Sequence, residues 1–277
     1  MAALKALAAI GDDKAGEAIE LASKDSNEAV RKAATTLSAA SGKGDATTAL
    51  AAILGKGSIG EQQNALTALG NLPEGKADDI LAQWLEKLLA GQLKSELALD
   101  LVEAAGKRKS AKVAGLLKKY EDGLSAAGPL AKYSWAMSGG NAAEGKKVFW
   151  EKAEASCLRC HKVNGEGGEV GPELGKIAAM QTREYLLESI AYPNKQIAQG
   201  FETLVVTLKN GQVYAGILKK ETDAELEINS PEDGMLKLKK ADVKERERGL
   251  SGMPEGLADV IGRRDLRDVV EYLSTLK

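Results

Sequence analysis

The sequence places all of its thiol and imidazole groups in one pentapeptide, Cys157-Leu158-Arg159-Cys160-His161. These two cysteines and this histidine are the only ones among the 277 residues. Roughly one random arrangement in 40,000 would give this C-x-x-C-H spacing, so chance does not account for it. The fold therefore has to present all three side chains at a single site.

The C-x-x-C-H spacing is the attachment signature of haem c. In that chemistry each thiol adds to a vinyl group to form a thioether, and the adjacent imidazole becomes an axial ligand of the iron. The pattern predicts one covalently attached haem, with Cys157 and Cys160 as the attachment points and His161 as an iron ligand.

A dithiol redox pair, a structural zinc site and a buried cysteine pair are the alternatives to a haem site. A thioredoxin-like pair would follow a buried strand in a βαβ unit, whereas the residues before Cys157 have a helical pattern. A structural zinc site needs four ligands, and the chain offers three, of which Cys160 and His161 are sequence neighbours. A buried cysteine pair with an incidental histidine does not account for the lack of both residue types in the rest of the chain. The haem hypothesis is therefore favoured.

Composition and charge argue against several classes of protein. Lys and Arg (38) nearly balance Asp and Glu (40), so no bulk charge predicts binding to nucleic acid or to a membrane surface. No apolar run reaches the length of a transmembrane helix. The first residues lack a charged region followed by an apolar core, although haem c is normally attached outside the cytoplasm. We therefore expect a piece of a longer, exported precursor that is located in the periplasm or an equivalent compartment.

Residues 1–137 have a purely helical pattern. Alanine-rich segments that end in glycine alternate with second apolar segments. The glycines recur at intervals of 31, 28 and 36 residues, at Gly11, Gly42, Gly70 and Gly106. Such a loose period is typical of stacked helical hairpins, and the segment Asp25–Ala34 resembles a HEAT repeat with an acidic turn before a Val-Arg-x-x-Ala helix. We expect a HEAT-like α-solenoid that serves as a scaffold or docking surface, with a generic alanine-rich bundle as the alternative.

The C-terminal half of the chain resembles class I cytochromes c. Gly145 and Phe149 lie on the predicted helix before the pentapeptide, where that family has a glycine and an aromatic residue that cross the C-terminal helix. The segment Gly171-Pro172-Glu173-Leu174 matches the family's loop after the haem motif, whose proline carbonyl accepts a hydrogen bond from the ligating histidine. The resemblance implies that the carbonyl of Pro172 orients His161.

The end of the chain extends this resemblance. The segment Ser251-Gly252-Met253-Pro254-Glu255-Gly256 is similar to the family's Met-Pro ligand loop, and a predicted amphipathic helix follows over 265–276. Tyr272 on that helix would meet the glycine and aromatic residue of the first helix. The resemblance implies that Met253 is the second axial ligand. The rivals for this role are Met180, which no proline follows, and Met235, which lies in a strand-like run.

Residues 200–248 separate the two parts of the cytochrome-like domain. Apolar and polar residues alternate over Phe201–Leu208, up to the turn Lys209-Asn210-Gly211. Asn-Gly between β-branched runs is a strong hairpin signal. Roughly four or five short strands in this span predict a small closed barrel that resembles SH3-like or Sm-like barrels. No RNA role follows, because fold alone does not carry function. We expect an inserted β-barrel within a mainly α chain whose cytochrome c fold occupies 138–199 and 249–277.

Helical repeats, a C-x-x-C-H core, an inserted β module and a late Met-Pro loop together resemble a haem-binding domain family of Planctomycetes and Verrucomicrobia. This resemblance implies that the module closes larger exported proteins, in some cases behind a β-propeller dehydrogenase-like domain. We expect an electron carrier rather than an enzyme, because His161 and Met253 would leave no coordination position for a substrate. Its partner would be a redox protein or a fused dehydrogenase domain. The alternatives are a haem enzyme or ligand sensor with an open distal site, and a docking module that carries a haem.

Overall fold

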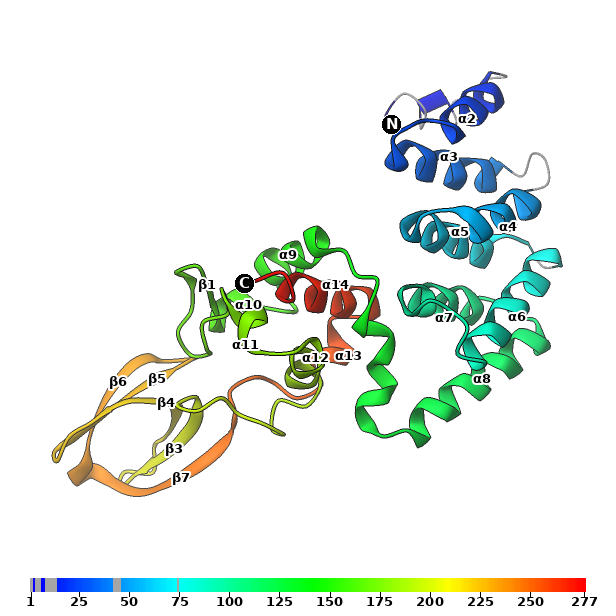
Figure 1. Ribbon diagram of the computed structural model, residues 1–277. Coiled ribbons are helices and arrows are strands. Elements are labelled where there is room, and N and C mark those ends of the chain that lie inside the picture. Colours follow the sequence, from blue (N-terminus) through cyan, green and yellow to red (C-terminus); the bar gives the residue numbers. More distant parts are fainter. Residues whose placement is uncertain (1, 3–5, 8–13, 42–45, 74) are drawn as a thin grey trace. The chain divides into compact units, whose positions relative to one another are not determined.

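The structure is a computed structural model that describes residues 2, 6, 7, 14–41, 46–73 and 75–277. The chain divides into two compact units, Met1–Trp135 and Ala136–Lys277 (Figure 1). The prediction of a mainly helical chain with an N-terminal helical stretch and a separate sheet region is confirmed. Most of the predicted helical segment 6–10, together with Gly11 and Gly42, lies outside the described residues.

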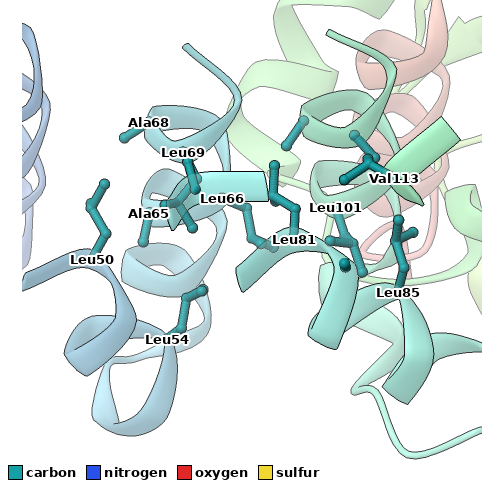
Figure 2. Close-up of a cluster of buried hydrophobic side chains, with 14 of the residues drawn as sticks. Leu50, Leu54, Ala65, Leu66, Ala68, Leu69, Leu81, Leu85, Leu101 and Val113 are labelled. Carbon is teal, nitrogen blue, oxygen red and sulfur yellow. The ribbon is translucent and has the colours of Figure 1, made fainter. Parts of the chain in front are cut away.

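The first unit is a series of packed helices. Helix α3 packs against α2 and α5, α5 also packs against α4 and α7, and α6 packs against α8. Leucines and alanines form the core between these helices, as Figure 2 shows for Leu66, Leu81 and Leu101. The described helices are α2 (Ala15–Ser23), α3 (Glu28–Ser41), α4 (Ala46–Lys56), α5 (Ile59–Asn71), α6 (Lys76–Leu89), α7 (Ala98–Gly106) and α8 (Ala111–Ala126), with the 3-10 turn η1 (Ser95–Leu97). That they form a HEAT-like solenoid stays a prediction.

Two ion pairs join segments of the first unit that are distant in the sequence. Arg31 Nε lies 2.5 Å from Glu61 Oε1, and Arg108 Nε lies 2.6 Å from Asp78 Oδ1, both across 30 residues of sequence. The side chain of Arg108 is 4% exposed and also donates to the carbonyl oxygen of Pro73, after the end of α5.

The second unit contains short helices at both ends of its sequence, and one of them carries Cys157 and Cys160. The helices are α9 (Ala142–Glu151), α10 (Cys157–Cys160), α11 (Ile177–Met180), α12 (Arg183–Ala191), α13 (Leu257–Val260) and α14 (Arg263–Leu273), and the 3-10 segment η2 (Pro129–Met137) precedes them. Asn141 caps α9 by accepting hydrogen bonds from the next turn, and Thr182 caps α12 in the same way. Helices α9 and α14, far apart in the sequence, cross at close range (Figure 1).

A five-stranded antiparallel sheet follows α12. Its order is β6-β5-β4-β3-β7, and the Asn210-Gly211 turn joins β3 to β4 as predicted. Its core consists of Val206, Leu226, Ile228 and Leu238. The strands are β3 (Glu202–Leu208), β4 (Val213–Glu221), β5 (Glu225–Ser230), β6 (Gly234–Lys239) and β7 (Val243–Ser251), with the 3-10 turn η3 (Lys240–Asp242) before β7. A separate two-stranded ribbon, β1 (Lys162–Val163) with β2 (Glu166–Gly167), follows α10.

The expected closed barrel is not shown. Within residues 200–251, all of which the structure describes, no hydrogen bonds join β6 to β7, so the sheet keeps two edges. The register of β7 gives a reason, because Arg246 lies opposite Val206 and Arg248 lies opposite Leu204, on the face that carries the core. Charged side chains on the inner face of an edge strand oppose further strand pairing. Whether 200–248 is an independent insertion stays a prediction, since residues 136–277 form one compact unit.

Candidate haem-binding site

The pentapeptide forms a single helical turn with a bend on each side. Ser156 adopts a left-handed conformation (φ 46°) before α10, and His161 returns to an extended conformation after it. Cys157 and Cys160 are three residues apart on this turn and therefore lie on the same face. Both are free thiols. The two thiols and the imidazole are thus presented together, as attachment of one cofactor requires.

The imidazole of His161 is fixed by the loop that follows the pentapeptide. Its Nδ1 lies 2.9 Å from the carbonyl oxygen of Pro172. A carbonyl can only accept, so Nδ1 carries the proton and Nε2 keeps a lone pair for a metal. Burial lowers the pKa of His161, while the Pro172 carbonyl acts in the opposite direction. Burial therefore favours the neutral imidazole, which is the form that ligates iron.

The backbone of Gly171 also lies against this ring. A Cβ atom at this position would lie 2.6 Å from Cε1 and 2.7 Å from Nδ1 of His161. The N–H of Gly171 also donates to the carbonyl oxygen of Cys160 at 2.8 Å. Only a residue without a side chain fits this approach, so the loop and the ring hold one another in place.

The environment of the thiols argues against a dithiol redox pair. Burial raises the pKa of Cys157 to about 11 and also raises the pKa of Cys160. Reactive thioredoxin-like cysteines have a lowered pKa, so this pair does not resemble a dithiol redox centre. Across the part of the chain that the structure describes, no cluster of three or more His, Cys, Asp or Glu residues has an arrangement that could hold a metal ion.

Met253 lies in the loop between β7 and α13. Its side chain is half-buried, and its N–H donates to Ser251 Oγ at 3.2 Å. Its two rivals are exposed on the surface, Met180 at 65% and Met235 at 57%. Burial of the side chain thus favours Met253, although its role as a ligand stays a prediction.

Contacts across the second unit connect this site to the closing helix and the sheet. The rings of Phe149 and Tyr272 lie 5.8 Å apart where α9 crosses α14. The sheet reaches the pentapeptide through Arg159, whose Nη2 donates to the carbonyl oxygen of Pro231 at 2.9 Å. It also reaches the following loop through Lys219, which donates to the carbonyl oxygen of Glu169 at 2.9 Å.

These residues fit a c-type haem. Two thiols and an imidazole with a free Nε2 form the donor set, and a glycine packs against the ring where a Cβ would collide. Two features of the site were not predicted from the sequence, the contact between Gly171 and the ring and a side-chain contact from Asn194 to the Met253 loop. No local signal in the sequence points to the latter contact, because the partners of Asn194 are 57 and 61 residues away.

Comparison with known proteins supports this assignment of the site. Residues 142–227 match the family model described as cytochrome c. The match covers less than half of the chain and ends within β5, so Met253 and α14 lie outside it. No curated protein matches the chain.

A cytochrome c domain supports haem-based electron transfer and implies a covalent haem c and a redox partner. It is typical of an electron carrier, alone or within a larger enzyme, and such domains are typically exported. Among the described residues, no helix combines the length and the apolar character needed to cross a membrane.

Proposed function

We propose that this chain transfers electrons through a single covalently bound haem c with His161 and Met253 as axial ligands. The observation that carries the proposal is the hydrogen bond between His161 Nδ1 and the carbonyl oxygen of Pro172, directly after a turn with two free thiols. Few other sites need a neutral imidazole that is held by its Nδ1 next to a C-x-x-C turn.

Each side chain of the site has a defined role in this proposal. Cys157 and Cys160 hold the cofactor by thioether bonds, and His161 offers Nε2 to the iron. The carbonyl of Pro172 keeps the proton on Nδ1 and fixes the direction of the ring. Met253 would supply the second ligand of the iron and would leave no coordination position for a substrate. When bound, the haem supplies an iron that takes up and releases one electron.

The larger protein to which this domain belongs is also part of the proposal. We place the domain in a larger exported redox protein, as a relay to a partner protein or to a fused dehydrogenase domain. The resemblance to the haem-binding domain family of Planctomycetes and Verrucomicrobia and the typical export of cytochrome c domains support this setting. In this view the helical repeats of the first unit act as a HEAT-like scaffold.

Covalent attachment of one haem is the direct test. We expect the intact mass of the protein, produced with a haem-attachment system, to exceed the chain mass by one haem that acid-acetone does not extract. Cys157→Ala with Cys160→Ala should abolish the added mass. Extractable haem, or none in the parent protein, would contradict the proposal. Reversible one-electron oxidation and reduction of the holoprotein would complete the test.

A further inference from the structure

Asn194 lies in a tight turn directly after α12. The N–H of Lys195 donates to the carbonyl oxygen of Tyr192 at 2.9 Å, which closes a turn with Pro193 and Asn194 as its central residues. Pro193 is buried and has a fixed φ, so the backbone that carries Asn194 is held firmly. The side chain of Asn194 therefore extends from a rigid base.

Both ends of the Asn194 amide contact the loop that carries Met253. Its Oδ1 accepts from the N–H of Ser251 at 2.7 Å, and its Nδ2 donates to Glu255 Oε1 at 2.6 Å. A backbone N–H can only donate, so the amide oxygen has to face Ser251 and the NH₂ group has to face the carboxylate. One side chain thus binds the loop two residues before and two residues after Met253.

Other restraints on this loop are few. Ser251 ends β7 opposite Glu202 of β3, and its Oγ accepts the N–H of Met253. Beyond Met253, residues 254–256 are exposed, and Gly256 turns the chain into α13 with a φ of 76°. Because so little apolar surface of the loop is buried, hydrogen bonds account for much of what holds it.

We infer that Asn194 is a positioning residue that keeps Met253 in place as the axial ligand, an inference that rests on the proposed function. It does not touch the iron or the thioether. It acts by lowering the population of states in which the loop leaves, since both of its hydrogen bonds are lost when residues 251–255 move away together. Asn194 therefore controls how often the iron becomes open to an external ligand.

The test compares Asn194→Ala with Asn210→Ala in the oxidised holoprotein. Asn210 is a matched control, because its amide also makes two hydrogen bonds across a turn, both to Gln212, but it lies in the turn between β3 and β4 and not at the Met253 loop. We expect Asn194→Ala to bind imidazole at least about tenfold faster than the parent does. The reason is that the variant loses two hydrogen bonds, one of them to a charged group. Its weak near-red sulfur-to-iron band should disappear at a lower temperature. Asn210→Ala should match the parent in both measurements.

A double-mutant cycle separates positioning from general loosening. If Asn194 acts through Met253, then Asn194→Ala should not change the rate of imidazole binding further in a Met253→Ala background. An equal acceleration in both backgrounds would overturn the inference. The inference is also overturned if the parent shows the near-red band but Asn194→Ala binds imidazole at the parent rate. That result would leave the proposed function intact. A parent without the band would instead refute Met253 ligation and the inference with it.

A milder variant covers the case in which Asn194→Ala does not fold. Asn194→Asp has nearly the same size and can still accept from Ser251, but its carboxylate faces that of Glu255. We expect a binding rate between those of the parent and Asn194→Ala, together with faster amide hydrogen exchange at Ser251. A parent-like rate and parent-like exchange in this variant would overturn the inference.

Discussion

A Cβ atom at Gly145 would lie 1.8 Å from the carbonyl oxygen of Asp268, so helices α9 and α14 cross at a distance that only glycine permits. The aromatic contact between Phe149 and Tyr272 lies at the same crossing, and Trp150 Nε1 donates to the hydroxyl of Tyr272 at 3.0 Å. This crossing joins the helix before the pentapeptide to the last helix of the chain. It therefore closes the domain around the site.

Gly145→Ala should separate the two helices. The obstacle is backbone, which cannot rotate away, so we expect a loss of about 2–3 kcal/mol in the free energy of unfolding of the second unit. Amide hydrogen exchange in α9 and α14 measures this loss. The control is Gly115→Ala in the middle of α8, where a Cβ meets nothing within 4 Å and alanine should stabilise its helix by up to about 1 kcal/mol. Unchanged exchange in Gly145→Ala would show that the two helices are free to move apart.

Gly171→Ala should displace the imidazole of His161. The added methyl group would meet three ring atoms within 3.0 Å, so the ring has to tilt and its hydrogen bond to the Pro172 carbonyl has to lengthen. We expect normal covalent attachment of haem, because the thiols are untouched, but a shifted reduction potential. Gly106→Ala, where a Cβ meets nothing within 4 Å, should leave the potential unchanged. A parent-like potential in Gly171→Ala would show that the ring tolerates the contact.

Two carboxyl groups should give opposite responses of stability to pH. Burial raises the pKa of Asp268, while the hydrogen bond that its carboxylate accepts from the Asn141 N–H acts in the opposite direction. The folded state therefore keeps the carboxyl proton of Asp268 to higher pH than the unfolded state does. The contribution of Asp268 to stability is therefore full below its unfolded pKa of about 3.9 and is lost as pH rises through the raised value. The Arg31 side chain lowers the pKa of Glu61, so the contribution of Glu61 is present above its unfolded pKa and is lost as pH falls.

Replacement of each group by its amide should reveal this difference. We expect the stability of Asp268→Asn relative to the parent to increase as pH rises from about 3.5 to 7, and that of Glu61→Gln to decrease over the same interval. Denaturant unfolding at both pH values measures these differences. The same trend for both variants would contradict the assignment.

Replacement of residues 200–248 by a short Gly-Ser linker tests the independence of the sheet. Glu202 and Ser251 are paired across β3 and β7, so the two ends of the segment already lie close together. The contacts from Arg159 and Lys219 are single exposed hydrogen bonds, each worth about 1 kcal/mol. We therefore expect covalent haem and the near-red band to survive, with faster binding of external ligands because β7 no longer holds Ser251. Loss of covalent haem would show that the sheet is part of the wall of the site.

Sequence patterns predicted those features that depend on neighbours in the chain. The shared site of Cys157, Cys160 and His161 and the Asn210-Gly211 hairpin are both local. The open sheet was not predicted, because it follows from the register that places Arg246 opposite Val206, and alternation alone does not fix register. The two hydrogen bonds of Asn194 reach residues that follow it by 57 and 61 positions in the sequence, so no local pattern shows them.

The identity of the second axial ligand separates an electron carrier from a haem enzyme or sensor. The half-buried side chain of Met253 lies on a loop bound at both ends, whereas Met180 is exposed at the end of the one-turn helix α11. Pro254 also restricts Met253 to extended conformations, which limits the ways in which the loop can rearrange.

We therefore expect the oxidised parent to show the near-red sulfur-to-iron band and to bind cyanide slowly. Met253→Ala should abolish the band, lower the reduction potential and open the iron to cyanide, because a soft thioether that favours ferrous iron is lost. Met180→Ala, the matched control, should change none of these. Loss of the band in Met180→Ala with retention in Met253→Ala would refute the assignment, and a parent that binds cyanide rapidly would favour the sensor or enzyme.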